Sequence, residues 1–154
     1  MGTLVGTRDR YLVLQLTGAE LVMLPIGELG EVFNISLLQV VQIPDLPAHV
    51  MGVCNWRGEV VWLVDVGAWL GFPPLYQQGF SQITYKVVLL QSGGLGLVVT
   101  RVGNILTCTP DQIQPVHFPL SGKLKEVCQG YVLQQGQTLL ALDGKQLAGA
   151  IGHG

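Results

Sequence analysis

Short apolar runs alternate with polar or glycine-containing turns along most of the chain. The runs are rich in Val, Ile and Leu and cover residues 11–16, 21–26, 60–66, 87–90, 95–99, 127–133 and 138–142. Glycine-containing turns separate several of them, at residues 17–19, 92–94 and 135–137. Strand-sized apolar runs separated by such turns are typical of antiparallel hairpins. The pattern therefore predicts a mainly β protein.

Helical pattern is confined to short segments. Asn34 is placed to cap a helix over residues 35–41, which has Leu and Val at helical spacing and is followed by two prolines. Two aspartates follow apolar runs and are placed to cap a last turn or helix: Asp65 before residues 66–70 and Asp143 before residues 144–150.

The two halves of the chain resemble each other. Four residues recur 78 positions later: Gly52, Gly58, Asp65 and Gly71 as Gly130, Gly136, Asp143 and Gly149. Residues 11–14 resemble 85–88, and Asn34-Ile35 with Gln42-Ile43 resemble Asn104-Ile105 with Gln112-Ile113. Chance agreement is the alternative, because Gly and Val are abundant. Taken at face value, the repeat predicts two half-domains, roughly residues 11–80 and 81–151.

A half-domain of about 70 residues with about five short strands avoids exposed sheet edges by curling into a small barrel. We therefore expect two five-stranded β-barrels packed side by side, with short helices, within a single domain over residues 1–154. Which strands the two barrels exchange is left open.

Low charge raises the question of a membrane span, since only 12% of residues are charged and the mean hydropathy is +0.46. The longest stretch without a charged residue, 66–85, contains two adjacent prolines and several Gln or Ser residues, so no spanning helix or membrane insertion is expected. The first residues lack the pattern of a secretory signal, which favours the cytoplasm. With a net charge of −2 and no Lys/Arg cluster, nucleic acid is a poor candidate partner.

Residues able to perform catalysis are sparse. The histidines His49, His117 and His153 have no metal-ligand spacing with one another or with the cysteines, and the three cysteines form no close pair. A nucleophile elbow and a phosphate-binding glycine loop are also missing from the sequence. We therefore expect no enzyme activity, no metal site and no cofactor.

One segment is distinctive: Gly52-Val53-Cys54-Asn55-Trp56-Arg57-Gly58, followed by a strand that ends at Asp65-Val66. It resembles the CheW-like family of bacterial chemosensory adaptors and kinase regulatory domains, whose pattern is Gly-Val-x-Asn-Leu-Arg-Gly and then a strand ending in Pro-apolar-apolar-Asp-Leu. The resemblance extends over nearly the whole chain. This chain departs from the pattern at four places: Trp56 replaces Leu, Trp62 replaces Pro, a usual acid is Gln42 or Val41 depending on the alignment, and a usual Asp is Thr100.

The resemblance implies two SH3-like barrels with a groove between them, and a non-enzymatic adaptor that couples a methyl-accepting chemoreceptor to a chemotaxis-type histidine kinase. The receptor's cytoplasmic tip would bind in the groove and the kinase regulatory domain on a barrel face, in the cytoplasm at membrane-associated arrays. Association with copies of itself or with paralogues is a further option. The alternatives are a divergent member serving type IV pilus motility or phototaxis assembly, and a small-ligand-binding barrel.

The candidate partner-binding residues lie in and around the motif: Arg57, Trp56, Asn55, Gly52, Gly58, Val40, Gln42 and Trp62. Arg57 stands in a glycine-flanked turn and is an interface-prone residue type, although it could instead brace the barrels. Gly52 and Gly58 could serve backbone conformation alone, Val40 could be core, and Trp62 could face either way. Trp56 is expected to be exposed, within a neutral, apolar surface near Arg57.

Overall fold

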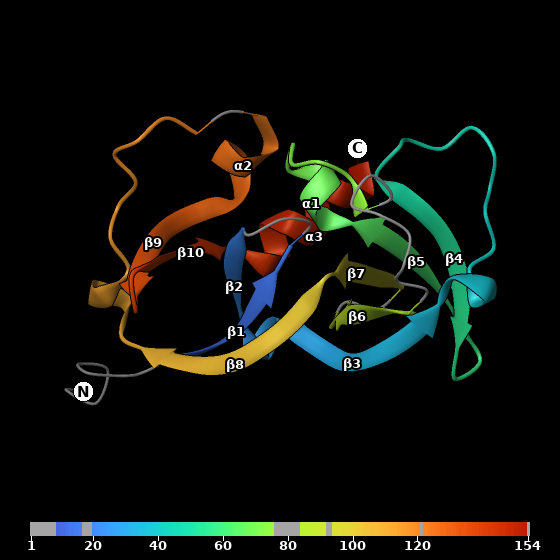
Figure 1. Ribbon diagram of the computed structural model, residues 1–154, viewed down its shortest axis with the longest axis horizontal. Helices are drawn as coiled ribbons and strands as arrows, with labels where there is room; N and C mark the ends of the chain where they lie inside the picture. The colour runs from blue at the N-terminus through green and yellow to red at the C-terminus, as the bar shows by residue number, and fades with distance from the viewer. Residues whose placement is uncertain (1–8, 17–19, 76–83, 92–93, 121, 154) are drawn as a thin grey trace.

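The computed structural model describes residues 9–16, 20–75, 84–91, 94–120 and 122–153, in which ten strands form two curved five-stranded sheets (Figure 1). The first sheet has the order β8-β1-β2-β10-β9 and consists of β1 (Asp9–Gln15), β2 (Leu21–Pro25), β8 (Arg101–Cys108), β9 (Cys128–Gln134) and β10 (Gln137–Leu142). The second has the order β3-β6-β7-β5-β4 and consists of β3 (Leu29–Ser36), β4 (Val50–Trp56), β5 (Glu59–Asp65), β6 (Thr84–Leu90) and β7 (Leu95–Val99). The expected mainly β architecture is confirmed.

Each sheet takes strands from both halves of the sequence. The hairpin β1–β2 pairs with β8 and β10, whereas the hairpin β6–β7 pairs with β3 and β5. A division of the chain near residue 80 therefore does not separate the sheets. The exchange arises because a short 3-10 turn, η2 (Ile26–Glu28), leads from β2 directly into β3 of the other sheet.

The repeat seen in the sequence corresponds to equivalent places in the two sheets, because β1 to β5 hold the positions that β6 to β10 hold in the other sheet. Gly52 and Gly130 lie where a returning backbone crosses an edge strand, and an added Cβ would overlap the carbonyl oxygens of Val41 and Gln114 respectively. These crossings are the bridges Val41–Val53 and Gln114–Tyr131. In each sheet the chain beyond one edge strand thus returns to the opposite edge, which closes a small barrel.

The last repeated pair has no common role. Gly71 follows the short helix α1 (Val66–Trp69) with φ +101°, whereas Gly149 lies inside the longer helix α3 (Gly144–His153). The aspartate pair does correspond: the side chain of Asp65 accepts a hydrogen bond from the N–H of Ala68, and that of Asp143 from the N–H groups of the first turn of α3. Both expected caps are confirmed.

The helix expected over residues 35–41 is wrong. Strand β3 continues to Ser36, where Ile35 is buried opposite Tyr85 of β6, and only a 3-10 turn, η3 (Leu37–Gln39), follows. Ser36 caps this turn in place of Asn34, and the side chain of Gln39 accepts a hydrogen bond from the N–H of Ser36. Tertiary pairing with β6 thus outweighs the local helical spacing.

The equivalent turn in the other half is η5 (Pro110–Gln112), where Gln112 completes the same capping box with Thr109. Gln112 therefore corresponds to Gln39 rather than to Gln42. Strands β3, β4 and β8 and the helix α2 (Gly122–Val127) were not among the elements expected from the sequence. The turns expected at residues 17–19 and 92–93 lie outside the described residues.

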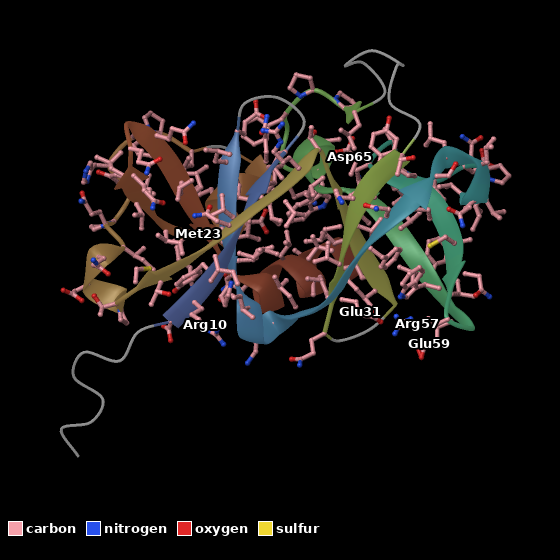
Figure 2. The ribbon with its side chains drawn as sticks, turned by 60° about the horizontal axis from the view of Figure 1, so that its bottom comes forward. Arg10, Met23, Glu31, Arg57, Glu59 and Asp65 are labelled. Carbon is pink, nitrogen blue, oxygen red and sulfur yellow. The ribbon has the colours of Figure 1, made fainter. Side chains whose placement is uncertain are left out.

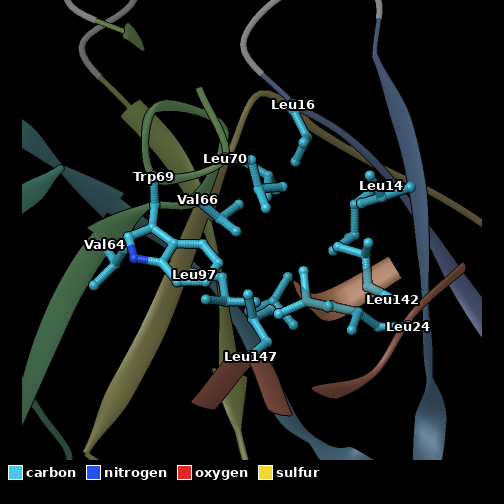
Figure 3. Close-up of a cluster of buried hydrophobic side chains, with 14 of the residues drawn as sticks. Leu14, Leu16, Leu24, Val64, Val66, Trp69, Leu70, Leu97, Leu142 and Leu147 are labelled. Carbon is cyan, nitrogen blue, oxygen red and sulfur yellow. The ribbon is translucent and has the colours of Figure 1, made fainter. Parts of the chain in front are cut away.

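The largest buried cluster lies between the sheets. Leu14, Leu24 and Leu142 of the first sheet meet Val64 and Leu97 of the second, and α1 and α3 add Trp69 and Leu147 (Figure 3). Each sheet also encloses its own smaller cluster. Burial of continuous apolar area on both faces joins the two barrels into one unit. None of the helices in the described residues is long and apolar enough to cross a membrane.

Candidate interaction site

The turn between β4 and β5 presents Arg57. Arg57 and Gly58 are its two central residues, with φ +52° and +83°, as a two-residue hairpin turn of this twist requires. The side chain of Asn55 accepts a hydrogen bond of 3.1 Å from the N–H of Gly58. Asn55 and Gly58 thus fix the turn, while the Arg57 side chain is 70% exposed.

Trp56 is not exposed as expected. It is the last residue of β4 and is half-buried, and its ring stacks on that of buried Phe33 with the ring centroids 4.0 Å apart and the planes at 6°. Its Nε1–H donates to Glu31 over 3.3 Å. Strand alternation directs Trp56 inward with Cys54, which explains why the ring packs against the core of the second sheet.

Glu31 joins the same group of side chains. Nη1 of Arg57 lies 3.1 Å from its carboxylate, and the Arg57 guanidinium carbon lies 5.4 Å from the centre of the Trp56 ring. We call Glu31, Phe33, Trp56 and Arg57 the clasp. Because β3 and β4 are opposite edges of the second sheet, the clasp links the two edges of its barrel. Figure 2 shows Glu31 and Arg57 near each other at this end.

The ion pair inside the clasp is a weak constraint on Arg57. Both side chains are substantially exposed, and exposed ion pairs contribute about 0–1 kcal/mol. Arginine also has five N–H donors, so donors remain for another acceptor. Arg57 is thus both braced within its own sheet and available at the surface.

Trp62 faces outward. It is 41% exposed on β5, and Val60, two residues earlier on the same face, is 59% exposed. Trp62 is opposite Val53 of β4, which is in turn bridged to Val41, 61% exposed. We call Val41, Val53, Val60 and Trp62 the apolar face. An exposed apolar surface near Arg57 is therefore present, built around Trp62 rather than Trp56.

Val40, Gln42 and Gly52 lie apart from the clasp. Val40 packs partly against the core of the second sheet, and an added Cβ on Gly52 would stand 3.0 Å from its Cγ1. Exposed Gln42 and Val40 line a pocket of about 640 Å³ together with Leu37, Ala48, Val50, Met51, Asp65, Leu75 and Tyr85. Figure 2 shows Asp65 well separated from the labelled Glu31 and Arg57.

Asp65 is the buried acid of the described residues, with 3% of its surface exposed. Its Oδ2 accepts a hydrogen bond of 2.7 Å from the N–H of Leu75. Burial raises the pKa of the Asp65 carboxyl, against the opposing effect of backbone hydrogen bonds from Leu75, Ala68 and Gly67. This residue therefore supports the connection between β5 and the chain beyond α1.

The described histidines and cysteines do not form a reactive site. Nε2 of His117 lies 3.0 Å from the hydroxyl of Tyr131. Cys54 and Cys108 are buried, and burial raises the pKa of both thiols, which disfavours the reactive thiolate. Among the described residues, no group of three His, Cys, Asp or Glu side chains could hold a metal ion.

Sequence reasoning missed Glu31 and Phe33 because strand β3 was not expected. The alternation of apolar and polar residues in Phe33-Asn34-Ile35-Ser36 was the available signal. It is short, and its overlap with the helical spacing of the next residues concealed it. Because β3 was not expected, the sequence offered no side chains across the barrel that could contact Trp56 and Arg57.

Comparison with known proteins agrees with this architecture. The model of the CheW-like domain matches residues 10–151. Chemotaxis protein CheW of Rhizobium meliloti (strain 1021) is 27% identical over 82% of this chain and 84% of its own, and the probable chemotaxis protein CheW of Rhizobium etli is 29% identical over 83% and 81%. The crystal structure of the scaffolding protein TtCheW from Thermoanaerobacter tengcongensis shares the fold, with a TM-score of 0.73, 18% identity and coverage of 88% and 89%. The chain belongs to the CheW-like family.

Proposed function

We propose that this protein is a non-enzymatic adaptor that couples a chemoreceptor to a chemotaxis histidine kinase, in the cytoplasm at receptor arrays. Support comes from the family model, which covers nearly the whole chain, and from relatives named as chemotaxis protein CheW. The observation that carries the site assignment is exposed Arg57 beside the apolar face. An arginine next to exposed apolar side chains is the usual composition of a protein-binding hot spot.

Two partners require two surfaces. We assign the clasp end and the apolar face to the kinase regulatory domain, because they offer a cation beside exposed apolar side chains of a sheet. We assign the receptor tip to the groove that the resemblance implies between the barrels, and we expect it beside the edge strands β3 and β8, which run along the lower side of Figure 1. Val32 of β3 and Ile105 of β8 are exposed. A helical hairpin can place its apolar face against such edges.

The test is capture of purified receptor tip and kinase regulatory domain by immobilised protein. Arg57→Glu reverses the exposed charge and is expected to reduce recovery of at least one partner severalfold, with an unchanged circular dichroism spectrum. Arg10→Glu is the matched control, because Arg10 is an exposed arginine on β1 outside the clasp. Equal recovery with both variants and with the unmodified protein would remove Arg57 from the interface.

Recovery of companion proteins from cell extract distinguishes the pathways. Chemoreceptors and a histidine kinase among the captured proteins support the adaptor. Pilus-assembly proteins without them would favour the divergent motility role. Capture by the Arg57→Glu protein is measured in parallel, and proteins that it recovers equally well are discounted.

A further inference from the structure

The two sheets allow the clasp to be compared with its counterpart. Val32 of β3 is opposite Val88 of β6, and Val102 of β8 is opposite Leu14 of β1, so the residues around them correspond. The turns Arg57-Gly58 and Gln135-Gly136 also correspond, with the same sign of φ at each position. The register of β8 shifts beside Val13, so that Gly103 and Asn104 together oppose Val13 where Phe33 alone opposes Val87. The clasp residues therefore match as follows: Glu31 with Arg101, Phe33 with the pair Gly103-Asn104, Trp56 with Gln134 and Arg57 with Gln135.

Both aromatic rings of the clasp are missing from the first sheet. Where Phe33 lies opposite Val87, Gly103 lies close beside Val13: an added Cβ would stand 3.2 Å from the Val13 carbonyl oxygen and 3.5 Å from its side chain. A pocket of about 260 Å³ occupies this end of the first sheet. The residues that line it include the counterparts of all four clasp residues: Arg101, Gly103, Gln134 and Gln135. We call this the mouth pocket.

The mouth pocket combines an apolar wall with a polar rim. Val13, Leu21 and Leu139 supply the apolar side chains, and Asn104, Gln134 and Gln137 supply amides that can donate and accept hydrogen bonds. Drug-sized ligands occupy pockets of about 300–1,000 Å³. The mouth pocket is smaller, and its volume suits a single aromatic group.

The charge of Arg101 at the rim is opposite to that of Glu31, its counterpart in the clasp. Glu31 in the clasp accepts from Trp56 and pairs with Arg57. Its counterpart Arg101 is exposed, and no ion pair joins it to any other residue that the structure describes. A guanidinium pairs well with a carboxylate through two parallel N–H···O bonds.

We propose that the mouth pocket binds a planar aromatic group that carries a carboxylate. The ring takes the space that Phe33 and Trp56 fill in the second sheet, and the carboxylate pairs with Arg101. This chemistry has two sources, a free aromatic acid or an aromatic side chain next to an acidic residue in a partner protein. The site is independent of Arg57 and of the adaptor role.

The probe is indole-3-acetate, titrated into the full chain and followed by the NMR signals of backbone and side-chain amides. Tryptamine has the same ring with a cation, and cyclohexylacetate has the carboxylate without a planar ring. We expect shifts at Asn104, Gln134 and Gln137, with indole-3-acetate binding at least about tenfold more tightly than either comparator, as a charge-assisted pair and a ring contact allow. Equal binding of the three compounds would overturn the proposal, as would the absence of shifts at these amides.

Two variants test the assignment of the pocket. Arg101→Gln should weaken indole-3-acetate about tenfold, whereas Arg10→Gln, an exposed arginine outside the pocket, should leave it unchanged. Gln134→Trp restores a ring at the Trp56 position and should abolish binding, with the melting temperature as the check on folding. Loss of binding with Arg10→Gln, or full binding with folded Gln134→Trp, contradicts the proposal.

A dipeptide arm separates the sources. N-acetyl-Trp-Glu-amide is compared with indole-3-acetate on the unmodified protein and on Arg101→Gln. Tighter Arg101-dependent binding of the peptide assigns the pocket to a partner's side chain, and tighter Arg101-dependent binding of the free acid assigns it to a small molecule. Binding of both that does not depend on Arg101 overturns the assignment.

Discussion

Glu31 competes weakly with a partner for Arg57. The carboxylate holds Nη1 of Arg57 at 3.1 Å and also accepts from Trp56. A partner carboxylate must compete with this internal pair. The clasp therefore restrains, weakly, the side chain to which we assign the interface.

Glu31→Gln should strengthen binding of the kinase regulatory domain severalfold, because the amide oxygen still accepts from Trp56 but carries no negative charge and holds the Arg57 guanidinium less strongly. Arg57→Gln should weaken it, and the free energy of unfolding should change by less than about 1 kcal/mol in both variants, as for other exposed pairs. Calorimetric titration gives the affinities and urea denaturation the stabilities. If Glu31→Gln weakens binding as much as Arg57→Gln, Glu31 positions Arg57 for the partner.

Asp65 should make stability depend on pH in a direction that is unusual for an acid. Burial raises its pKa in the folded state, so the folded protein binds this proton more readily than the unfolded chain. The contribution is stabilising at low pH and is lost as the pH rises through the raised pKa, starting from the ordinary Asp value of about 3.9. Relative to Asp65→Asn, the unmodified protein should therefore lose stability as the pH rises from about 4 towards neutrality. Urea denaturation across this range measures the difference, and parallel curves would contradict it.

Much of the motif's local chemistry could be predicted from its residues. Gly58 meets the φ requirement of the turn, and Asp65 caps α1, because both roles depend on neighbours in sequence. Trp56 could not be placed the same way. Its burial depends on Phe33, which is 23 residues away and on the opposite edge of the sheet.

At the level of elements, the two barrels depend on close backbone crossings at equivalent glycines. Gly130→Ala should destabilise the fold by about 1–3 kcal/mol, because its Cβ would overlap the Gln114 carbonyl oxygen and the Ile113 side chain. Gly149→Ala is the matched control inside α3, where nothing lies within 4 Å of the added Cβ, and should stabilise by about 1 kcal/mol through helix propensity. Urea denaturation of both variants checks the opposite signs, and loss of stability in both would remove the role of the crossing.

The strands that sequence patterns missed all lie at sheet edges. Strands β3 and β8 expose many side chains, so their apolar runs are interrupted, and the run of β4 is interrupted by Gly52 and by exposed Asn55. The hydrophobic runs that were recognised include the strands β2, β5, β7 and β10, which have neighbours on both sides. The exchange of strands between the halves could not be predicted from the repeat, because a repeat shows that the two halves are alike and not which of their strands pair.

At the scale of the molecule, equivalent outer faces of the two barrels are covered differently. Tyr131 holds the position in the first sheet that Val53 holds in the second. Tyr131 is buried beneath His117 and Phe118, whose rings lie 5.8 and 5.5 Å from its own. The apolar face around Val53 has no such cover from the described chain, and Trp62 and Val60 stay exposed. The exposed apolar face thus lies on the second sheet, where the described chain leaves it uncovered.

Substituting Trp62 tests whether a partner covers this face. Trp62→Gln removes the largest exposed apolar group of the apolar face and should weaken binding of the kinase regulatory domain about tenfold or more, because aromatic residues dominate interface energies. Leu133→Gln is the matched control, since Leu133 is 61% exposed on β9 of the other sheet. Stability should change little in either variant, because neither side chain belongs to a buried cluster. Calorimetric titration of both variants measures the affinities. Equal affinities would show that the apolar face is not the kinase surface. A loss confined to Trp62→Gln places the kinase domain on the face whose equivalent in the first sheet is covered by His117 and Phe118.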